Sequence, residues 1–367
     1  MSDPETPESI HALDLSRRKD GPAGRFVRAS LTRARRAAAP YTSTTRLAVT
    51  QLARSRPALA GAAILACVAF VALFADFLAN DLPIACRRHG HLHVLPNLTR
   101  PAELRGTDCA RMRAERIPGD WLIEPLVAFG PNTASRPEEA LLAPLTPGHP
   151  FGTDARARDL FARVVYGART ALSVGVGGTV VLVTIGVTLG ASAGFFGGVV
   201  DGLLSRMIES LTSVPTLLWV LVVAGLTPHP STATLIWTIA LTAWTELARL
   251  VRAEVLRALG QDYVTAARAL GASPGRVLRR HVLPNAIGPA VVSAAFGLAS
   301  IVLVEATVDF LGVPSSDALP SWGETLGEAR FHAGAWWLIV FPGILLLATL
   351  GAANLISEAA RDVFSDS

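Results

Sequence analysis

Long uncharged runs are the feature of this sequence that most constrains its fold. Stretches without Asp, Glu, Lys or Arg cover residues 57–75, 170–200, 210–245, 282–304 and 331–357. The hydrocarbon core of a bilayer is about 30 Å thick, and roughly 20 apolar helical residues are needed to cross it. The third stretch is 36 residues long and contains Thr227-Pro228-His229-Pro230, which a helix interior would avoid. It is therefore predicted to form two spans joined by a tight turn, giving six spans in all.

The predicted fold is an all-α polytopic membrane protein with six transmembrane helices. Basic residues in short connections orient such a bundle, because they concentrate on the cytoplasmic side. Residues 1–56 hold 11 Lys and Arg against 5 acids, and residues 246–281 hold 7 Arg against 3 acids. Residues 305–330 hold 5 acids and a single Arg. We therefore predict that both termini are cytoplasmic.

The spans divide the chain into five segments. We predict a basic cytoplasmic arm over 1–56, a first transmembrane helix over 57–79, an exterior insert with a pre-span helix over 80–169, a five-helix core over 170–357 that includes a cytoplasmic loop at 250–285, and a cytoplasmic tail over 358–367. The Arg-rich arm does not interleave aromatic residues into a stacking platform. We therefore expect it to face lipid headgroups, with nucleic-acid binding as the less favoured alternative.

The exterior insert carries two groups of potential ligands. Cys86 and Cys109 both lie in it, and two cysteines in an oxidising compartment favour a disulfide over a metal pair. Closing that ring of about 24 residues would stabilise the insert by roughly 3 kcal/mol. His89, His91 and His93 alternate, so on a strand they would share one face. A polar strand face is favoured over a metal site, because no second cluster of ligands is visible.

Two absences exclude catalytic functions. Lys19 is the one lysine among 33 basic residues and lies in a polar N-terminal stretch, so it cannot complete a Walker-type phosphate loop. Neither a Gly-x-Ser-x-Gly elbow nor a His-Glu-x-x-His helix occurs. The chain is predicted not to be an enzyme, with no cofactor and no metal of its own.

The most informative stretch is YVTAARALGASPGRVLRRHVLPN, residues 263–285. Residues 263–270 favour a helix, and Gly271 is typical of a helix C-terminus. Ser273 is expected to cap a second helix, and Pro284 to end it before the next span. Ala266, Ala267 and Gly271 present little side-chain bulk. This pattern predicts a rigid helix–turn–helix knob suited to docking, although an amphipathic interfacial hairpin is the alternative by spacing alone.

The same stretch resembles the Glu-Ala-Ala loop of permease subunits in binding-protein-dependent ABC importers. The matching residues are Ala266, Ala267, Gly271, His281, Leu283 and Pro284, and Thr265 stands where the family has its acid. The resemblance implies that this loop couples the chain to a separate ATPase. The implied coupling residues are Tyr263, Thr265, Ala266, Ala267, Leu270, Gly271, Arg276, His281, Leu283 and Pro284.

Other motifs are similar to the dipeptide and oligopeptide class of these permeases. Before the second span they are Gly152-Thr153-Asp154, Arg158-Asp159-Leu160-Phe161 and Tyr166-Gly167-Ala168-Arg169, with Ala157 in place of a usual glycine. Later in the chain they are Asp309-Phe310-Leu311-Gly312 and Pro320-Ser321-Trp322-Gly323. The resemblance covers roughly residues 57–365, and the long insert looks most like that of microcin C-type peptide importers.

The resemblance implies a type I ABC importer permease in the bacterial inner membrane, surrounded by membrane lipid. Its implied partners are a second homologous permease, two ATPase subunits that bind ATP and magnesium, and a periplasmic or lipid-anchored substrate-binding protein. Peptides are the implied cargo, while nickel chelates or peptide antibiotics remain alternatives. Nothing in the chain points to nucleic acid as a partner.

Two sets of residues inside the spans are singled out. Gly186, Gly190 and Gly194 recur every four residues, which favours close helix packing. Glu305 and Asp309, one helical turn apart and next to Phe310, are candidates for a pathway or gate. The alternatives are a structural ion pair, or proton sites of a self-contained secondary carrier.

Overall fold

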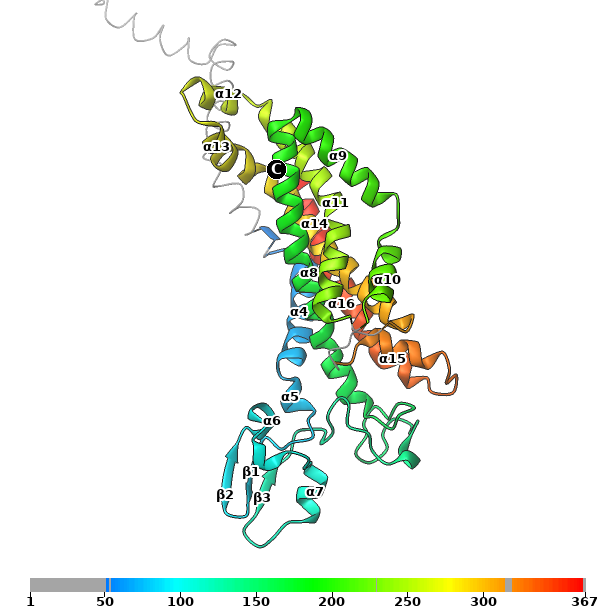
Figure 1. The fold of residues 1–367 in the computed structure, drawn as a ribbon. Coiled ribbons are helices and arrows are strands. Elements are labelled where there is room, and N and C mark those ends of the chain that lie inside the picture. Colours follow the sequence, from blue (N-terminus) through cyan, green and yellow to red (C-terminus); the bar gives the residue numbers. More distant parts are fainter. Residues whose placement is uncertain (1–50, 53, 229, 314–318, 366–367) are drawn as a thin grey trace, which may run out of the picture. The chain divides into compact units, whose positions relative to one another are not determined.

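The computed structural model describes residues 51–52, 54–228, 230–313 and 319–365, and Figure 1 labels its elements from α4 onward. Nearly all of the predicted N-terminal arm lies outside the described residues, as do His229 of the predicted turn and the last two residues of the predicted C-terminal tail. Helices make up most of the remaining chain. The longer ones are α4 (Arg56–Leu73), α8 (Leu160–Phe196), α9 (Gly198–Thr212), α10 (Thr216–Leu226), α11 (Thr232–Leu259), α14 (Leu283–Phe310) and α16 (Trp337–Ser365).

Among the described residues, four helices are long and apolar enough to cross a membrane. They comprise Arg56–Leu73, Leu160–Phe196, Ala290–Phe310 and Trp337–Val363, and a fifth span exists if the bent pair α9 and α10 is counted as one. The helix α11 is also long, but its second half carries Glu246, Arg249, Arg252, Glu254 and Arg257. The structure therefore confirms a mostly helical membrane chain, and its described residues contain four or five candidate spans where six were predicted.

The predicted break in the third uncharged run is confirmed. Helix α10 ends at Leu226, and α11 begins at Thr232, where the Ser231 hydroxyl accepts a hydrogen bond from the Thr234 N–H group at 3.2 Å. The run is broken a second time at Pro215, where α9 and α10 meet at an angle of 76°. Proline accounts for this bend, because its ring cannot continue a straight helix from the preceding residue.

The insert between α4 and α8 contains a small sheet, so an all-α description of the chain is wrong here. Strands β1 (Ala85–Arg88), β2 (His91–Val94) and β3 (Trp121–Ile123) pair antiparallel in the order β2-β1-β3. The short helices η1 (Ala102–Leu104) and α7 (Cys109–Ala114) contribute to a core in which Leu104 and Met112 pack with Cys86 and Leu82. Figure 1 shows this lobe beyond the α5 end (Ala75–Leu78) of the first long helix.

Neither group of potential ligands in the insert is arranged as predicted. Cys86 and Cys109 are buried free thiols, so the predicted disulfide is not formed. Cys86 lies on the central strand, whereas Cys109 begins α7 and donates its N–H group to the Asp81 carbonyl. His89 is not on the strand with His91 and His93, but in the preceding turn with a φ of 50°. The three histidines therefore do not share a strand face.

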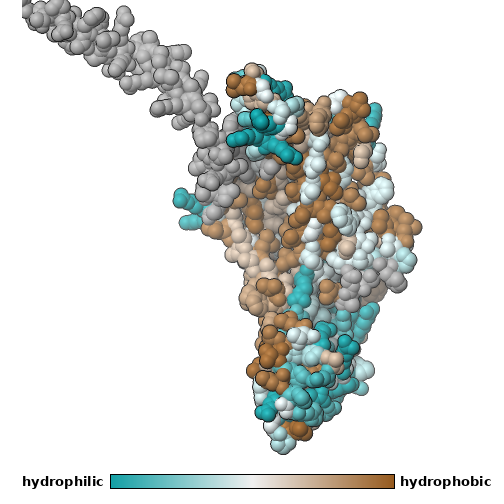
Figure 2. Space-filling view, turned by 60° about the vertical axis from the view of Figure 1, so that its left-hand side comes forward, coloured by the Kyte–Doolittle hydropathy of each residue, from teal (hydrophilic) through white to brown (hydrophobic). Residues whose placement is uncertain are grey.

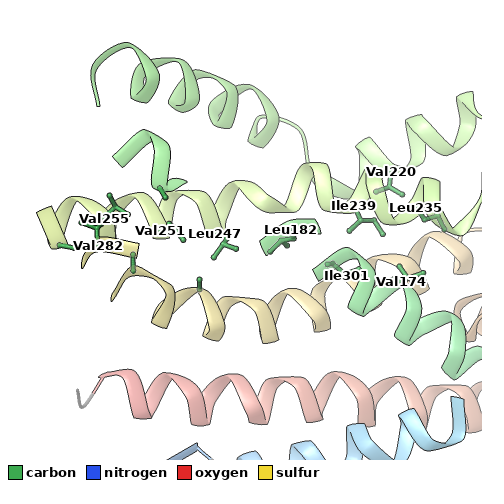
Figure 3. Packing of buried hydrophobic residues seen from close by; sticks show 14 of the residues in the cluster. Val174, Leu182, Val220, Leu235, Ile239, Leu247, Val251, Val255, Val282 and Ile301 are labelled. Atoms are coloured by element: carbon green, nitrogen blue, oxygen red, sulfur yellow. The ribbon is translucent and has the colours of Figure 1, made fainter. Parts of the chain in front are cut away.

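The largest apolar core joins α8, α11 and α14. In Figure 3, Leu247, Val251 and Val255 of α11 lie along one side, with Leu182 of α8 and Ile301 of α14 beside them. Figure 2 shows hydrophobic surface over the helices and hydrophilic surface gathered on the exterior insert and at the opposite tip. That distribution is what a bundle surrounded by lipid requires, since lipid-facing side chains must be apolar.

Close packing at the predicted glycine repeat is confirmed. A Cβ atom added to Gly190 would lie 2.4 Å from the carbonyl oxygen of Ala248, and one added to Gly194 would lie 2.9 Å from that of Arg252. At Gly186 the neighbour is the Leu247 side chain at 3.0 Å. The backbones of α8 and α11 therefore approach each other as closely as glycine permits.

Candidate coupling site and membrane cavity

Two short helices protrude from the end of the bundle opposite the exterior insert. They are α12 (Asp262–Ala269) and α13 (Pro274–Val277), and the C-terminal end of α16 lies at the same end of the molecule (Figure 1). The predicted helix–turn–helix is thus present. Because the insert and these helices occupy opposite ends, a membrane around the bundle would place them on opposite sides.

Gly271 shapes the turn between the two helices. Its φ of +80° is a conformation that residues with a Cβ atom rarely adopt. The Gly271 N–H group donates to the Arg268 carbonyl, and the Ala272 N–H group donates to the Ala267 carbonyl. These two bonds form a Schellman motif, which satisfies carbonyls that the helix end would leave unpaired. The sequence correctly predicted this helix end.

The two faces of α12 differ in what they contact. Val264 is fully buried in the core that also holds Val255 and Val277. Thr265, Ala266 and the tip residue Leu270 are exposed, and the Leu270 side chain is 88% accessible. Ala267 is buried, so the expectation that it belongs to the low-bulk outer surface is wrong. The exposed residues Thr265, Ala266, Ala269, Leu270 and Gly271 form the surface that we call the docking face, and the exposed Arg268 lies beside it.

The chain after the turn is continuous helix, contrary to the prediction that Pro284 ends it. The Ser273 side chain makes no capping hydrogen bond, although its carbonyl accepts from Arg276 and Val277. The segment η3 (Leu278–Val282) then forms a π-helical turn that leads directly into α14. Pro284 is the second residue of α14 and directly follows the change from π-helical to α-helical hydrogen bonding, so the helix passes through it without an N–H group at that position.

The remaining predicted coupling residues follow the turn or lie beside it. Arg276, Arg279 and Arg280 are exposed, while His281 and Leu283 are half-buried. Tyr263 is half-buried, and its hydroxyl accepts a hydrogen bond from the Asn285 amide at 2.9 Å. Asn285 was not among the predicted coupling residues. Its position directly after the Leu-Pro pair was the one available signal.

A cavity of about 760 Å³ opens between α8, α9, α10, α11 and α14. Its polar wall includes Thr242, Thr245, Glu246, Arg249, Ser293 and Ser300. The apolar wall includes Leu182, Ile239 and Phe296. Hydroxyl groups and peptide-sized volume in the middle of an apolar bundle are suited to a polar solute that must pass through it.

The motif before the second span and the motif at 320–323, which follows α14, meet at the insert end of the bundle. Arg163 of α8 is fully buried and its guanidinium lies 2.9 Å from Glu324 of α15 (Trp322–Ala329). Arg158 lies 2.6 Å from Asp154 and 3.5 Å from both Glu324 and Glu328. These pairs fix the pre-span segment to α15. Two sequence motifs about 160 residues apart therefore form one buried ionic network.

Two aromatic hydrogen bonds reinforce this junction. The Trp322 indole N–H group donates to the Val164 carbonyl at 2.9 Å, and that of Trp337 donates to the Thr153 carbonyl at 3.0 Å. Ala157, which replaces a family glycine, adopts a φ of 54°. The local turn therefore keeps the left-handed geometry that a glycine would adopt more easily.

The candidate gate residues lie beneath α15. Glu305 and Asp309 are only 2% and 4% accessible, so both side chains are enclosed within the chain. Asp309 and Phe310 line a separate cavity of about 420 Å³ at the exterior end, and Glu305 does not line it. The Arg330 guanidinium stacks 4.5 Å from the centre of the Phe310 ring. Neither acid lines the larger cavity.

Within the described ranges, no group of three or more His, Cys, Asp or Glu side chains is arranged to hold a metal ion. The fold defines a multi-pass membrane protein with two helices protruding at one end and an open cavity among its helices.

Comparison with known proteins identifies the family. Residues 186–366 match the family described as binding-protein-dependent transport system inner membrane component. The dipeptide transport system permease protein of Alkalihalophilus pseudofirmus is 32% identical over 66% of this chain and 79% of its own length. A putative peptide transport system permease protein of Brucella suis is 38% identical over 59% of this chain and 72% of its own length. The peptidoglycan transport system permease protein of Agrobacterium fabrum is 32% identical over 80% of this chain and 86% of its own length.

The chain therefore belongs to the family of inner-membrane components of binding-protein-dependent ABC transport systems. Members of this family are permease subunits and not catalysts, so the predicted absence of enzymatic activity agrees with the family assignment. Family membership also implies an ATPase and a binding protein as partners.

Proposed function

We propose that this chain is one of two permease subunits in an ATP-driven importer of peptides, and that an ATPase subunit binds its docking face. The observation that carries the proposal is the protrusion of α12 and α13 with a low-bulk surface around an exposed Leu270. Exposed large apolar side chains at a protruding tip favour contact with another protein. The relatives' names, which refer to dipeptide, peptide and peptidoglycan transport, support peptides or peptide-bearing fragments as cargo.

The cavity of about 760 Å³ supplies this chain's half of the pathway in the proposal. Thr242, Thr245, Ser293 and Ser300 offer hydroxyl groups to peptide backbone amides and carbonyls. Glu246 and Arg249 add one charge of each sign, which suits the two ends of a zwitterionic peptide. The companion permease would complete the wall, and the two ATPases would hold ATP and magnesium.

The proposed topology has both termini and the docking face in the cytoplasm, with the insert in the periplasm. In this proposal helix α11 is the additional span that brings the total to six. Its 28 residues have a length of about 42 Å, and its first 14 residues are free of charge. The charged second half would then lie at the cytoplasmic boundary, where Arg side chains are retained. The region 1–56 remains a proposed cytoplasmic arm that faces lipid headgroups.

The test is uptake by the complete complex, with binding protein and both ATPases, in proteoliposomes. Uptake of labelled peptide should require ATP and should continue when the proton gradient is collapsed. Uptake that persists without the ATPases and follows an imposed proton gradient would instead establish a secondary carrier, with Glu305 and Asp309 as the candidate proton sites.

Cross-linking separates docking from transport. In a Cys67→Ala background, Leu270→Cys should form a cross-link to an ATPase subunit, while the native Cys86 and Cys109 are buried and should not react. Arg111→Cys is the matched control, because its side chain is 66% exposed on the insert at the other end of the molecule. A cross-link from Arg111→Cys but not from Leu270→Cys would show that the chain has the opposite orientation in the membrane.

A further inference from the structure

We propose that the hydrogen bond between Tyr263 and Asn285 is the joint that transmits motion of the docking face to the cavity. The inference rests on the proposed function and adds two positioning residues to it. Tyr263 lies in the first turn of α12 and Asn285 in the first turn of α14, so one side-chain contact connects the docking helix to a membrane-spanning helix.

The Asn285 amide nitrogen makes two hydrogen bonds. It donates to the Tyr263 hydroxyl at 2.9 Å and to the His281 carbonyl at 2.7 Å. An amide has two N–H groups, so both are used. Asn285 therefore connects α12, the π-helical turn η3 and its own helix through one planar group that has little freedom to rotate.

The backbone beside Asn285 is the place in this helix where such a clamp is needed. In η3 the Leu283 N–H group reaches back five residues to the Leu278 carbonyl. Pro284 follows at once and has no N–H group to offer. A π-turn inside a long helix leaves fewer hydrogen bonds holding it straight and is a frequent feature of functional sites. Without the Asn285 side chain, α14 would be free to bend here when α12 is pushed.

Helix α14 carries the motion onward. Ser293, Phe296, Ser300 and Val304 of this helix line the cavity, and they lie two to five turns beyond Asn285. Val264 of α12, Val282 at the end of η3 and Ala286 in the first turn of α14 belong to the same buried core. That packing keeps the two helices together, but apolar contacts can slide. A directed hydrogen bond fixes one side chain against the other, so that a movement of α12 also moves α14.

The test measures peptide imported per ATP hydrolysed by the complete complex in proteoliposomes. Tyr263→Phe removes only the hydroxyl that accepts the bond, and Asn285→Ala removes the whole clamp. For Tyr263→Phe we expect the ATPases to remain bound in normal stoichiometry while transport per ATP falls by about 2- to 10-fold, the equivalent of one net hydrogen bond. Transport per ATP should fall further in Asn285→Ala, and adding Tyr263→Phe to that variant should cause less than the additive loss, because the two residues share one bond.

Tyr166→Phe is the matched control. It removes one buried hydroxyl, which donates to Asp76 at 2.6 Å and accepts from Asn80 at 3.4 Å, at the insert end of the bundle. Because its bond to a carboxylate is the stronger one, this variant should lower the melting temperature at least as much as Tyr263→Phe, yet leave transport per ATP unchanged. If peptide imported per ATP were unchanged in Tyr263→Phe, or fell equally in Tyr166→Phe, the proposed role of the Tyr263–Asn285 bond would be refuted. The proposal that an ATPase docks on α12 would not be affected. If Leu270→Cys formed no cross-link in the Cys67→Ala chain with Tyr263 and Asn285 intact, the docking proposal itself would be refuted.

Discussion

The contact between α8 and α11 gives the sharpest prediction for stability. Gly190→Ala would place a methyl group 2.4 Å from the carbonyl oxygen and 2.9 Å from the Cα atom of Ala248. Both neighbours are backbone atoms, so no side chain can rotate away. Ordinary carbon contacts begin near about 3.5 Å, so the two helices would have to separate by about 1 Å at this point.

The cost can be set against the usual benefit of alanine. In an unconstrained helix, replacing glycine with alanine stabilises by about 0.5–1 kcal/mol. Overpacking of a rigid interface costs about 1–3 kcal/mol, so Gly190→Ala should destabilise the fold. The net cost is about 0–2.5 kcal/mol, and with a shift of about 2–4 °C for each kcal/mol the melting temperature in detergent should be up to about 10 °C lower than that of the unmodified chain.

The matched control is Gly202→Ala on α9. A Cβ atom there has nothing within 4 Å, so the same substitution should leave the melting temperature unchanged or raise it slightly. The reasoning would be refuted if Gly190→Ala melted at or above the temperature of the unmodified chain. Such a result would mean that α8 and α11 do not meet at Gly190.

Three further predictions concern the turn, the buried network and the thiols. Gly271→Val should reduce ATP-dependent uptake because its φ of +80° strains any branched side chain, whereas Gly275→Val, in open space at an ordinary helical φ, should transport normally. Arg163→Met should destabilise by about 3–5 kcal/mol in thermal unfolding, since it leaves Glu324 without its buried partner, and Glu324→Gln in the same chain should recover part of the loss. Cys109 should resist alkylation at pH 8 until the chain unfolds, as followed by mass spectrometry, because burial raises its pKa from 9.0 to about 12. The unfolded thiol ionises first, so this group's stabilising contribution should be lost as the pH rises above about 9, and rapid labelling at pH 8 would contradict its burial.

Local sequence patterns predicted the helices well, because each depends on a short uninterrupted segment. The uncharged runs, the break before Thr232 and the glycine stop at Gly271 all appear in the structure. The glycine repeat also predicted close packing, although the sequence did not show that α11 would be the neighbour. That choice depends on contacts between residues about 60 positions apart, and no periodicity encodes them.

The errors arose where tertiary packing decides the outcome. Ala267 was expected on the outer surface, but the direction in which a short helix turns its faces depends on the core beneath it. Pro284 was expected to end a helix, yet the π-turn before it shifts the hydrogen bonds so that the helix continues. The strands of the insert have three or four residues each, too few for alternation to distinguish a strand from a loop.

The position of α14 shows how the proposed docking face and the candidate gate residues could be coupled although they lie at opposite ends of the bundle. One helix of 28 residues, about 42 Å long, begins at the Asn285 clamp, passes the cavity at Ser293 and Ser300, and ends at Asp309 beneath α15. At its far end, α15 is held by the Trp322 and Arg163 contacts to α8. A helix clamped at one end and packed against a buried ionic network at the other cannot absorb a displacement by bending locally. A push on the docking face must therefore either move the exterior end as well or break the clamp, and those are the two outcomes that transport per ATP distinguishes.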